Sequence, residues 1–127
     1  MRIKEMQLNI LGSTWKVVSR KEKDDERLKN ASGLTDPSCR MIVLADATPE
    51  EYTIGVPAND LQRTLRHEIV HAFLYESGLW CNSGYCENWA MHEEIVDWIS
   101  LQLPKIWEVC SLAGAMPGQS IALDEDR

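Results

Sequence analysis

The residues with the clearest chemical potential form one short motif, His67-Glu68-Ile69-Val70-His71. Residues four apart on a helix lie on the same face, so the two imidazoles can bind one metal ion together. Glu68 falls about 100° around the helix from His67, which keeps its carboxylate off the metal. Its carboxylate is instead placed to accept a proton from a water molecule that the metal activates. The motif therefore predicts a metal-dependent hydrolase with Glu68 as general base.

An amphipathic helix should hold this motif. Asn59 with Gln62 three positions later resembles a capping box, which predicts that the helix begins there, and Gly78 predicts an end near Glu76. The apolar residues recur at helical spacing on one stripe: Leu61, Leu65, Ile69, Ala72 and Phe73. Because the two histidines lie roughly opposite this stripe, the helix has separate packing and ligand faces. The alternative is a pair of surface histidines beside a solvated glutamate.

A third metal ligand must come from elsewhere, because catalytic zinc sites usually combine three protein ligands with one open position. Glu93 and Asp97 lie one turn apart on a second predicted helix, so Glu93 could bind the metal while Asp97 orients a ligand histidine. His92 is a rival ligand, although it falls within the apolar arc of the same helix. Glu93 is favoured, with His92 and then Glu94 as alternatives.

The two motifs together resemble a known family. HEIVH, followed after residues 72–92 by Glu-x-x-x-Asp, resembles the gluzincin pattern of thermolysin-like metallopeptidases. The strings LRHEIVHAFLYESGL and ENWAMHEEIVDWISLQLPKI are more specifically similar to small phage- and prophage-encoded HExxH proteins, a minimal zincin class, over residues 60–107. This resemblance implies that His67, His71 and Glu93 bind zinc, that Glu68 is the base and that Asp97 supports a ligand.

The resemblance has one departure and two more distant branches. Gluzincins often have Asn before the ligand glutamate, where this chain has His92. SprT-like proteins take a third histidine from a later helix, and peptidases of the ImmA/IrrE type regulate phage immunity by cleaving a repressor. In zincins generally, an edge strand of the sheet pairs with the extended substrate, and residues 40–46 are the candidate for that strand.

The remaining elements predict the fold class. Residues 6–11 and 14–19 are β-compatible runs joined at Gly12-Ser13 as a hairpin, and residues 40–46 read as a buried strand. The second helix is expected over residues 87–103, ended by Pro104. We expect an α+β, minimal zincin-like fold, in which a small, mainly antiparallel sheet packs on the HExxH helix and a second ligand-bearing helix closes the site.

Length and charge limit the partners. The 127 residues suit one domain, predicted over residues 1–115, followed by a flexible acidic tail over residues 116–127. A formal net charge of −7 argues against nucleic acid, and no apolar run is long enough for a membrane span. The chain opens without an export-signal pattern, which predicts a cytoplasmic protein with reduced cysteines at positions 39, 81, 86 and 110.

We therefore expect a zinc-dependent metallopeptidase that acts on a peptide or protein substrate. Two alternatives are a zinc-binding regulatory or structural module without turnover, and a phage-immunity-type peptidase that cleaves one specific regulator. Tyr75 and Tyr85 are expected to pack rather than to stabilise an oxyanion. The sequence leaves the substrate, the cleavage specificity and the oligomeric state open.

Overall fold

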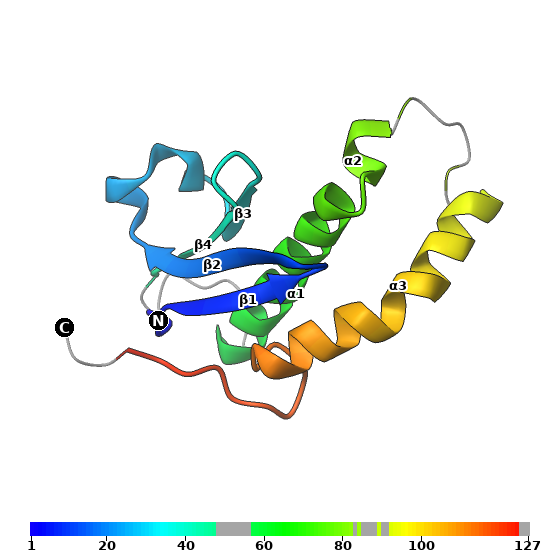
Figure 1. The fold of residues 1–127 in the computed structure, drawn as a ribbon. Coiled ribbons are helices and arrows are strands. Elements are labelled where there is room, and N and C mark those ends of the chain that lie inside the picture. The colour runs from blue at the N-terminus through cyan, green and yellow to red at the C-terminus, as the bar shows by residue number, and fades with distance from the viewer. Residues whose placement is uncertain (48–56, 83, 85–88, 90–91, 125–127) are drawn as a thin grey trace.

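A computed structural model describes residues 1–47, 57–82, 84, 89 and 92–124 of the chain (Figure 1). The described elements, in chain order, are β1 (Met6–Ile10), β2 (Ser13–Arg20), η1 (Glu22–Asp24), η2 (Glu26–Leu28), β3 (Gly33–Asp36), β4 (Met41–Ala45), α1 (Pro57–Glu76), α2 (Leu79–Asn82) and α3 (Glu93–Leu112). These elements confirm the predicted α+β class. No helix in the described ranges is long and apolar enough to cross a membrane.

The four strands form one mixed sheet in the order β1-β2-β4-β3. β1 and β2 form the predicted antiparallel hairpin, in which Leu11 and Gly12 both adopt positive φ at the turn. β2 pairs with β4 in parallel, and β4 pairs with β3 in antiparallel. Two of the three pairings are therefore antiparallel, and the buried strand expected over residues 40–46 is confirmed as β4.

One expectation about the sheet is wrong. Residues 40–46 were the candidate edge strand, but β4 has a hydrogen-bonded neighbour on each side and lies inside the sheet. The edge strand on this side is β3, which the sequence pattern did not predict because Gly33 and Pro37 resemble turn residues. Four residues with half-buried side chains carry too little alternation to stand out as a strand.

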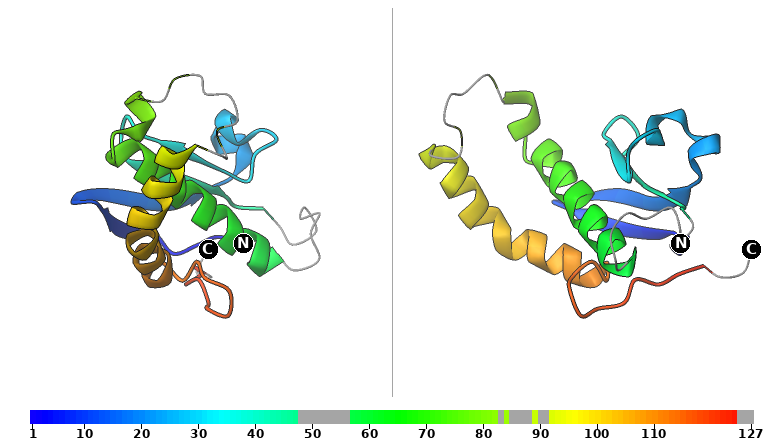
Figure 2. Two further views of the ribbon diagram at one scale, coloured as in Figure 1. Left: turned by 90° about the vertical axis from the view of Figure 1, so that its right-hand side faces the viewer. Right: turned by 180° about the vertical axis from the view of Figure 1, so that it is seen from behind.

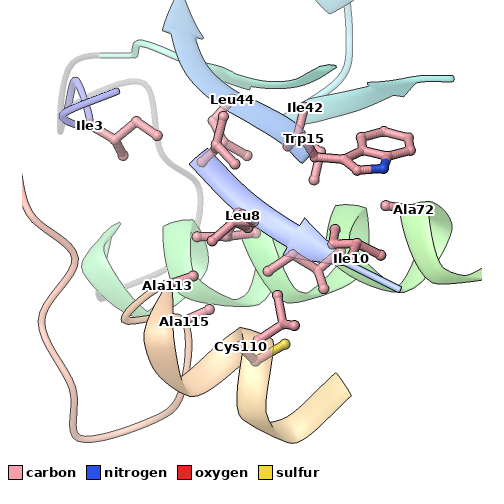
Figure 3. Packing of buried hydrophobic residues seen from close by; sticks show 14 of the residues in the cluster. Ile3, Leu8, Ile10, Trp15, Ile42, Leu44, Ala72, Cys110, Ala113 and Ala115 are labelled. Carbon is pink, nitrogen blue, oxygen red and sulfur yellow. The ribbon is translucent and has the colours of Figure 1, made fainter. Parts of the chain in front are cut away.

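The core lies between the sheet and α1, which crosses one face of the sheet (Figures 1 and 2). The predicted apolar stripe of α1 is buried, since Leu65, Ile69 and Ala72 are inaccessible and Phe73 is 1% exposed. These side chains meet the inward residues of the strands, among them Trp15 (Figure 3). The packing fixes the rotation of α1 about its axis.

α1 confirms the predicted end at Glu76, with Gly78 at positive φ just beyond it, but its predicted start is wrong. The helix already includes Pro57, so Asn59 lies within the first turn and is not the cap. Gln62 does not complete a capping box. The two N–H groups of its side-chain amide instead lie within hydrogen-bond distance of three carbonyl oxygens of the chain after α3, in Gly114, Met116 and Gln119.

α3 differs more from expectation. It begins at Glu93, and Pro104, the predicted stop, lies inside a helix that continues to Leu112. A proline within a helix removes one hydrogen bond and costs about 3 kcal/mol, so tertiary packing must offset this cost. Val109 and Cys110 are buried in the core beyond Pro104 and provide that packing. Residue 87, the predicted start, lies outside the described residues.

The chain after α3 returns along the sheet. Arg66 donates a hydrogen bond of 2.6 Å to the carbonyl oxygen of Ala115, and Leu123 forms a bridge with Ile3. The bridge at Leu123 involves part of residues 116–127, the segment predicted to be a flexible tail. Residues 125–127 lie outside the described part of the chain.

The cysteines that the structure describes, Cys39, Cys81 and Cys110, are free thiols as predicted. Burial raises the pKa of the Cys110 thiol to about 11, so this core cysteine stays protonated at neutral pH. Cys86 lies outside the described residues.

Stability at acidic pH should depend on Arg27. The Ser38 hydroxyl and then Arg27 lower the pKa of Asp36 to about 2, and Arg27 lowers the pKa of Asp25 well below its usual range. Because these folded-state pKa values lie below the unfolded value of about 3.9, the stabilisation is present above that pH and is lost as the pH falls through the folded values. Arg27→Met should therefore lower Tm at pH 6, and the difference from wild type should shrink toward pH 2.

Thermal unfolding followed by circular dichroism between pH 2 and 7 measures this difference. Lys23→Met is the matched control, because Lys23 is an exposed cation on η1 for which no ion pair occurs among the described residues. A pH-independent Tm difference for Arg27→Met would show that packing, not charge, explains the loss.

Candidate metal centre

The two histidines of the motif face each other on α1. Their Nε2 atoms lie 3.1 Å apart, and their ring centroids are separated by 4.7 Å. Two nitrogens each about 2.05 Å from a tetrahedral zinc ion would be roughly 3.3 Å apart. The imidazoles of His67 and His71 therefore already have nearly the separation that joint binding of one metal ion requires.

Glu68 completes the group from the boundary between helix and sheet. The candidate ligand atoms of His67, Glu68 and His71 all lie within 4.8 Å of one another, so this group could hold a metal ion. Glu68 is only 5% exposed, whereas His67 is exposed and His71 is half-buried. The three residues are thus brought together as the motif predicts, with the carboxylate on the protein side of the imidazoles.

A threonine on β3 fixes Glu68. The hydroxyl of Thr35 lies 3.0 Å from Oε1 of Glu68 and 3.1 Å from the backbone carbonyl oxygen of the same residue, and it can donate to either. A buried carboxylate needs such a donor, because its desolvation is otherwise costly. Thr35 thereby links the edge of the sheet to the motif, a role that no sequence motif indicated.

A glycine makes this approach of β3 to α1 possible. A Cβ atom placed on Gly33 would lie 2.9 Å from Cγ2 of Thr64 and 3.1 Å from the carbonyl oxygen of Val43. Any larger residue would push β3 away from α1 or displace Thr64. Gly33 is therefore a close-packing residue that lets Thr35 reach Glu68.

A row of aromatic rings joins the site to the core. The rings of His71 and Trp80 meet edge to face with centroids 6.4 Å apart, Trp80 meets Tyr75 at 6.3 Å, and Tyr75 meets the buried Trp15 at 6.2 Å. Tyr75 packs in this row, as expected. Trp80, on the short helix α2, remains 46% exposed and forms an apolar wall beside His71. Tyr85 lies outside the described residues.

The far end of the aromatic row is held by a carboxylate. Glu76 accepts hydrogen bonds from the Trp15 indole at 2.8 Å, from the Ser13 hydroxyl at 3.2 Å and from Arg40. Burial opposes ionisation of Glu76, but the hydrogen bonds from Arg40 and Trp15 outweigh it and lower the pKa of the carboxyl. The ionised Glu76 therefore fixes the end of α1 to the hairpin.

The proposed third ligands lie elsewhere. Among the residues that the structure describes, the metal-capable group contains neither Glu93 nor its alternatives His92 and Glu94, and all three are exposed. His92 is the N-cap of α3, and its Nδ1 accepts a hydrogen bond of 3.3 Å from the backbone N–H of Glu94. Figure 2 shows α1 and α3 close together at the C-terminal end of α3 and apart at its start. Asp97 is also exposed, and it directly precedes Trp98, whose indole donates a hydrogen bond of 3.1 Å to the hydroxyl of Ser77.

A cavity opens beside the motif. It has a volume of about 390 Å³, within the usual range for ligand sites. The residues that line it are Ser32, Gly33, Arg63, Thr64, His67 and Glu68. The cavity therefore runs between the β3 side and α1, and it contains one motif histidine, the buried carboxylate and one arginine that the sequence had not singled out.

Comparisons of the chain with protein-family models, with curated proteins and with solved structures found no match.

Removing one imidazole should abolish tight metal binding. His71→Ala leaves a single nitrogen at the site, so the affinity for zinc should fall by more than the roughly 10- to 100-fold typical of losing a residue that only supports a ligand. Competition with a chromophoric chelator measures this affinity. Lys105→Ala, which changes an exposed residue of α3, should keep the wild-type value. Equal affinities for wild type and His71→Ala would place the metal elsewhere.

Proposed function

We propose that this protein is a zinc-dependent metallopeptidase that hydrolyses peptide bonds with Glu68 as general base. The observation that carries the proposal is the pair of Nε2 atoms of His67 and His71, 3.1 Å apart, next to a buried carboxylate that lines an open cavity together with His67. The alternative, a pair of solvated surface histidines, does not explain why the glutamate between them is buried and hydrogen-bonded to Thr35. The donor set fits zinc, because imidazole nitrogens are preferred zinc ligands.

The residues of the site have distinct tasks. When bound, zinc polarises a carbonyl group and makes a water molecule more acidic. His67 and His71 would hold the metal, and Glu68 would accept the proton from the attacking water and pass it to the leaving amine. Thr35 engages Oε1 of Glu68, which leaves Oε2 as the oxygen that moves the proton. A fixed carboxylate performs this transfer without first having to reorient.

The substrate we propose is an extended segment of a peptide or protein. In zincins, to which the motif region is similar, an edge strand of the sheet pairs with the substrate. β3 is the edge strand beside this site, and it holds Thr35 next to Glu68. We therefore assign this task to Gly33–Asp36 in place of residues 40–46. Strand addition to an exposed edge is a common way to bind peptides.

Glu93 remains the proposed third ligand. It is exposed in the first turn of α3, where an acidic side chain is favourable near the positive end of the helix dipole. Binding the same ion as His67 and His71 would require the start of α3 to move toward α1. The hydrogen bond of 3.1 Å from the Trp98 indole to the Ser77 hydroxyl already links this half of α3 to the residue that follows α1.

The direct experiment measures metal content and hydrolysis together. Purified protein should retain about one zinc per chain and should cleave an unfolded protein such as reduced casein, and a chelator should stop the cleavage reversibly. A zinc-loaded protein that cleaves nothing would favour a regulatory or structural module. Cleavage only of one partner protein would favour a phage-immunity-type peptidase.

Glu68→Gln should abolish hydrolysis and retain about one zinc per chain, since the amide cannot accept the proton and the carboxylate is not needed as a ligand. Zinc content by atomic absorption and cleavage of a quenched fluorescent peptide measure the two effects separately. Loss of zinc in this variant would move Glu68 into the ligand set.

Thr35→Val should lower kcat by about tenfold, because the isosteric side chain keeps the packing but no longer holds Oε1 of Glu68. Thr35→Ser restores the hydroxyl and should recover most of the rate. Zinc affinity should change little in either variant, whereas Tm should fall in Thr35→Val, where the buried Glu68 carboxylate loses its donor, and recover in Thr35→Ser. An equal kcat for the valine and serine variants would show that the hydrogen bond from Thr35 to Glu68 does not determine kcat.

Glu93→Ala should weaken zinc binding severely, and Asp97→Ala by roughly 10- to 100-fold as the loss of a supporting residue. His92→Ala should matter little for the metal. Chelator competition on the three variants decides the assignment. If His92→Ala loses the metal while Glu93→Ala retains it, a three-histidine site replaces the glutamate ligand.

A further inference from the structure

The cavity beside the motif contains one fixed cation. Arg63 precedes His67 by four residues, so the two side chains leave the same face of α1 about 6 Å apart along the helix axis. Arg63 and Glu68 are the charged residues that line the cavity. Their charges cancel, so a divalent ion on His67 and His71 would make the cavity positive.

Arg63 also has hydrogen-bonding capacity to spare for a ligand. Among the described residues, its guanidinium pairs with Asp60, whose Oδ1 accepts a hydrogen bond of 3.0 Å from one terminal nitrogen. A guanidinium has five N–H donors, and Asp60 does not line this cavity. The side chain of Arg63 is 65% exposed, whereas that of Asp60 is 9% exposed. Asp60 therefore holds one terminal nitrogen of the guanidinium, and the other N–H groups remain available to solvent and to a ligand in the cavity.

The neighbouring groups suit a carboxylate as well. The side chains of Ser32 and Thr64, which also line the cavity, carry hydroxyl donors. Arginine is the residue that best matches the two oxygens of a carboxylate. A protein with a net charge of −7 repels anions in general, but the positive charge of Arg63 attracts them locally at the cavity.

We propose that the cavity selects ligands with a carboxylate next to the metal-binding group, and that Arg63 binds this carboxylate. This inference rests on the proposed function, because it names the substrate class of the same site. Successive residues of an extended peptide are about 3.3 Å apart, so a carboxylate one or two residues from the reacting carbonyl spans the axial separation of His67 and Arg63. The carboxylate belongs either to an acidic side chain or to the C-terminus of a short peptide.

The test uses zinc-loaded protein and short peptide hydroxamates, which bind zinc and do not depend on turnover. One pair differs only by Glu against Gln, and a second pair has a free or an amidated C-terminus. Wild type should bind the carboxylate-containing member of one pair about three- to tenfold more tightly at low ionic strength, and 0.5 M salt should reduce this ratio. The pair that shows the preference identifies the source of the carboxylate.

Variants assign the preference to Arg63. Arg63→Gln should bring the ratio to about one, and Arg63→Lys should retain part of it. Asp60→Asn frees the guanidinium from its competing carboxylate and should raise the ratio above that of wild type. Lys105→Gln, a cation removed from α3, should leave the ratio unchanged. Zinc content and Tm of every variant verify that the metal and the fold are retained.

The outcomes separate this inference from the proposed function. Equal affinity within both pairs in wild type, or an unchanged ratio in Arg63→Gln, overturns the carboxylate site while leaving peptide hydrolysis intact. A carboxylate preference that Arg63→Gln removes, in a protein that hydrolyses no peptide, supports the site and overturns the peptidase. Absence of hydroxamate binding to the wild type overturns both.

Discussion

The packing of α1 on the sheet is the constraint on which the rest of the site depends. Leu65, Ile69 and Ala72 are fully buried, so α1 cannot rotate about its axis without exposing them. That fixed rotation turns His67 toward solvent and puts Glu68 at the edge of the core. The buried leucine and isoleucine contribute about 1.5–3 kcal/mol each and the alanine methyl less, which together hold the imidazoles in place before any metal binds.

The sequence predicted this helix well because a single local periodicity determines both of its faces. The spacing of 3.6 residues that makes the apolar stripe also puts His67 and His71 on one side, and neither depends on distant parts of the chain. The hairpin of β1 and β2 was predictable for the same reason, since Gly12 allows the turn and the flanking runs are adjacent in the chain.

The features that were missed depend on contacts between distant residues. β3 is a strand because β4 pairs with it and because Gly33 lets it approach Thr64, neither of which a local pattern reveals. Pro104 lies inside α3 because the residues beyond it are buried, which overrides the local preference for a stop. Likewise, Thr35 and Arg63 belong to the site through the folding of β3 against α1, and a motif in one segment could not indicate them.

Glu93 and His92, the two candidates for the third metal ligand, differ in the hydrogen bonds that metal binding would break. The Nδ1 of His92 accepts the N-cap hydrogen bond of α3, and losing an N-cap costs about 1 kcal/mol. A metal on Nδ1 would occupy the lone pair that accepts this bond, and a metal on Nε2 would leave the proton on Nδ1, so either mode of binding would break the cap. Within the described part of the chain, Glu93 caps no backbone group, and the helix dipole favours its charge in the first turn. A movement of α3 toward α1 would therefore preserve the His92 cap if Glu93 is the ligand and would break it if His92 is the ligand. The cap, a contact outside the motif, thus favours the glutamate over the histidine on energetic grounds.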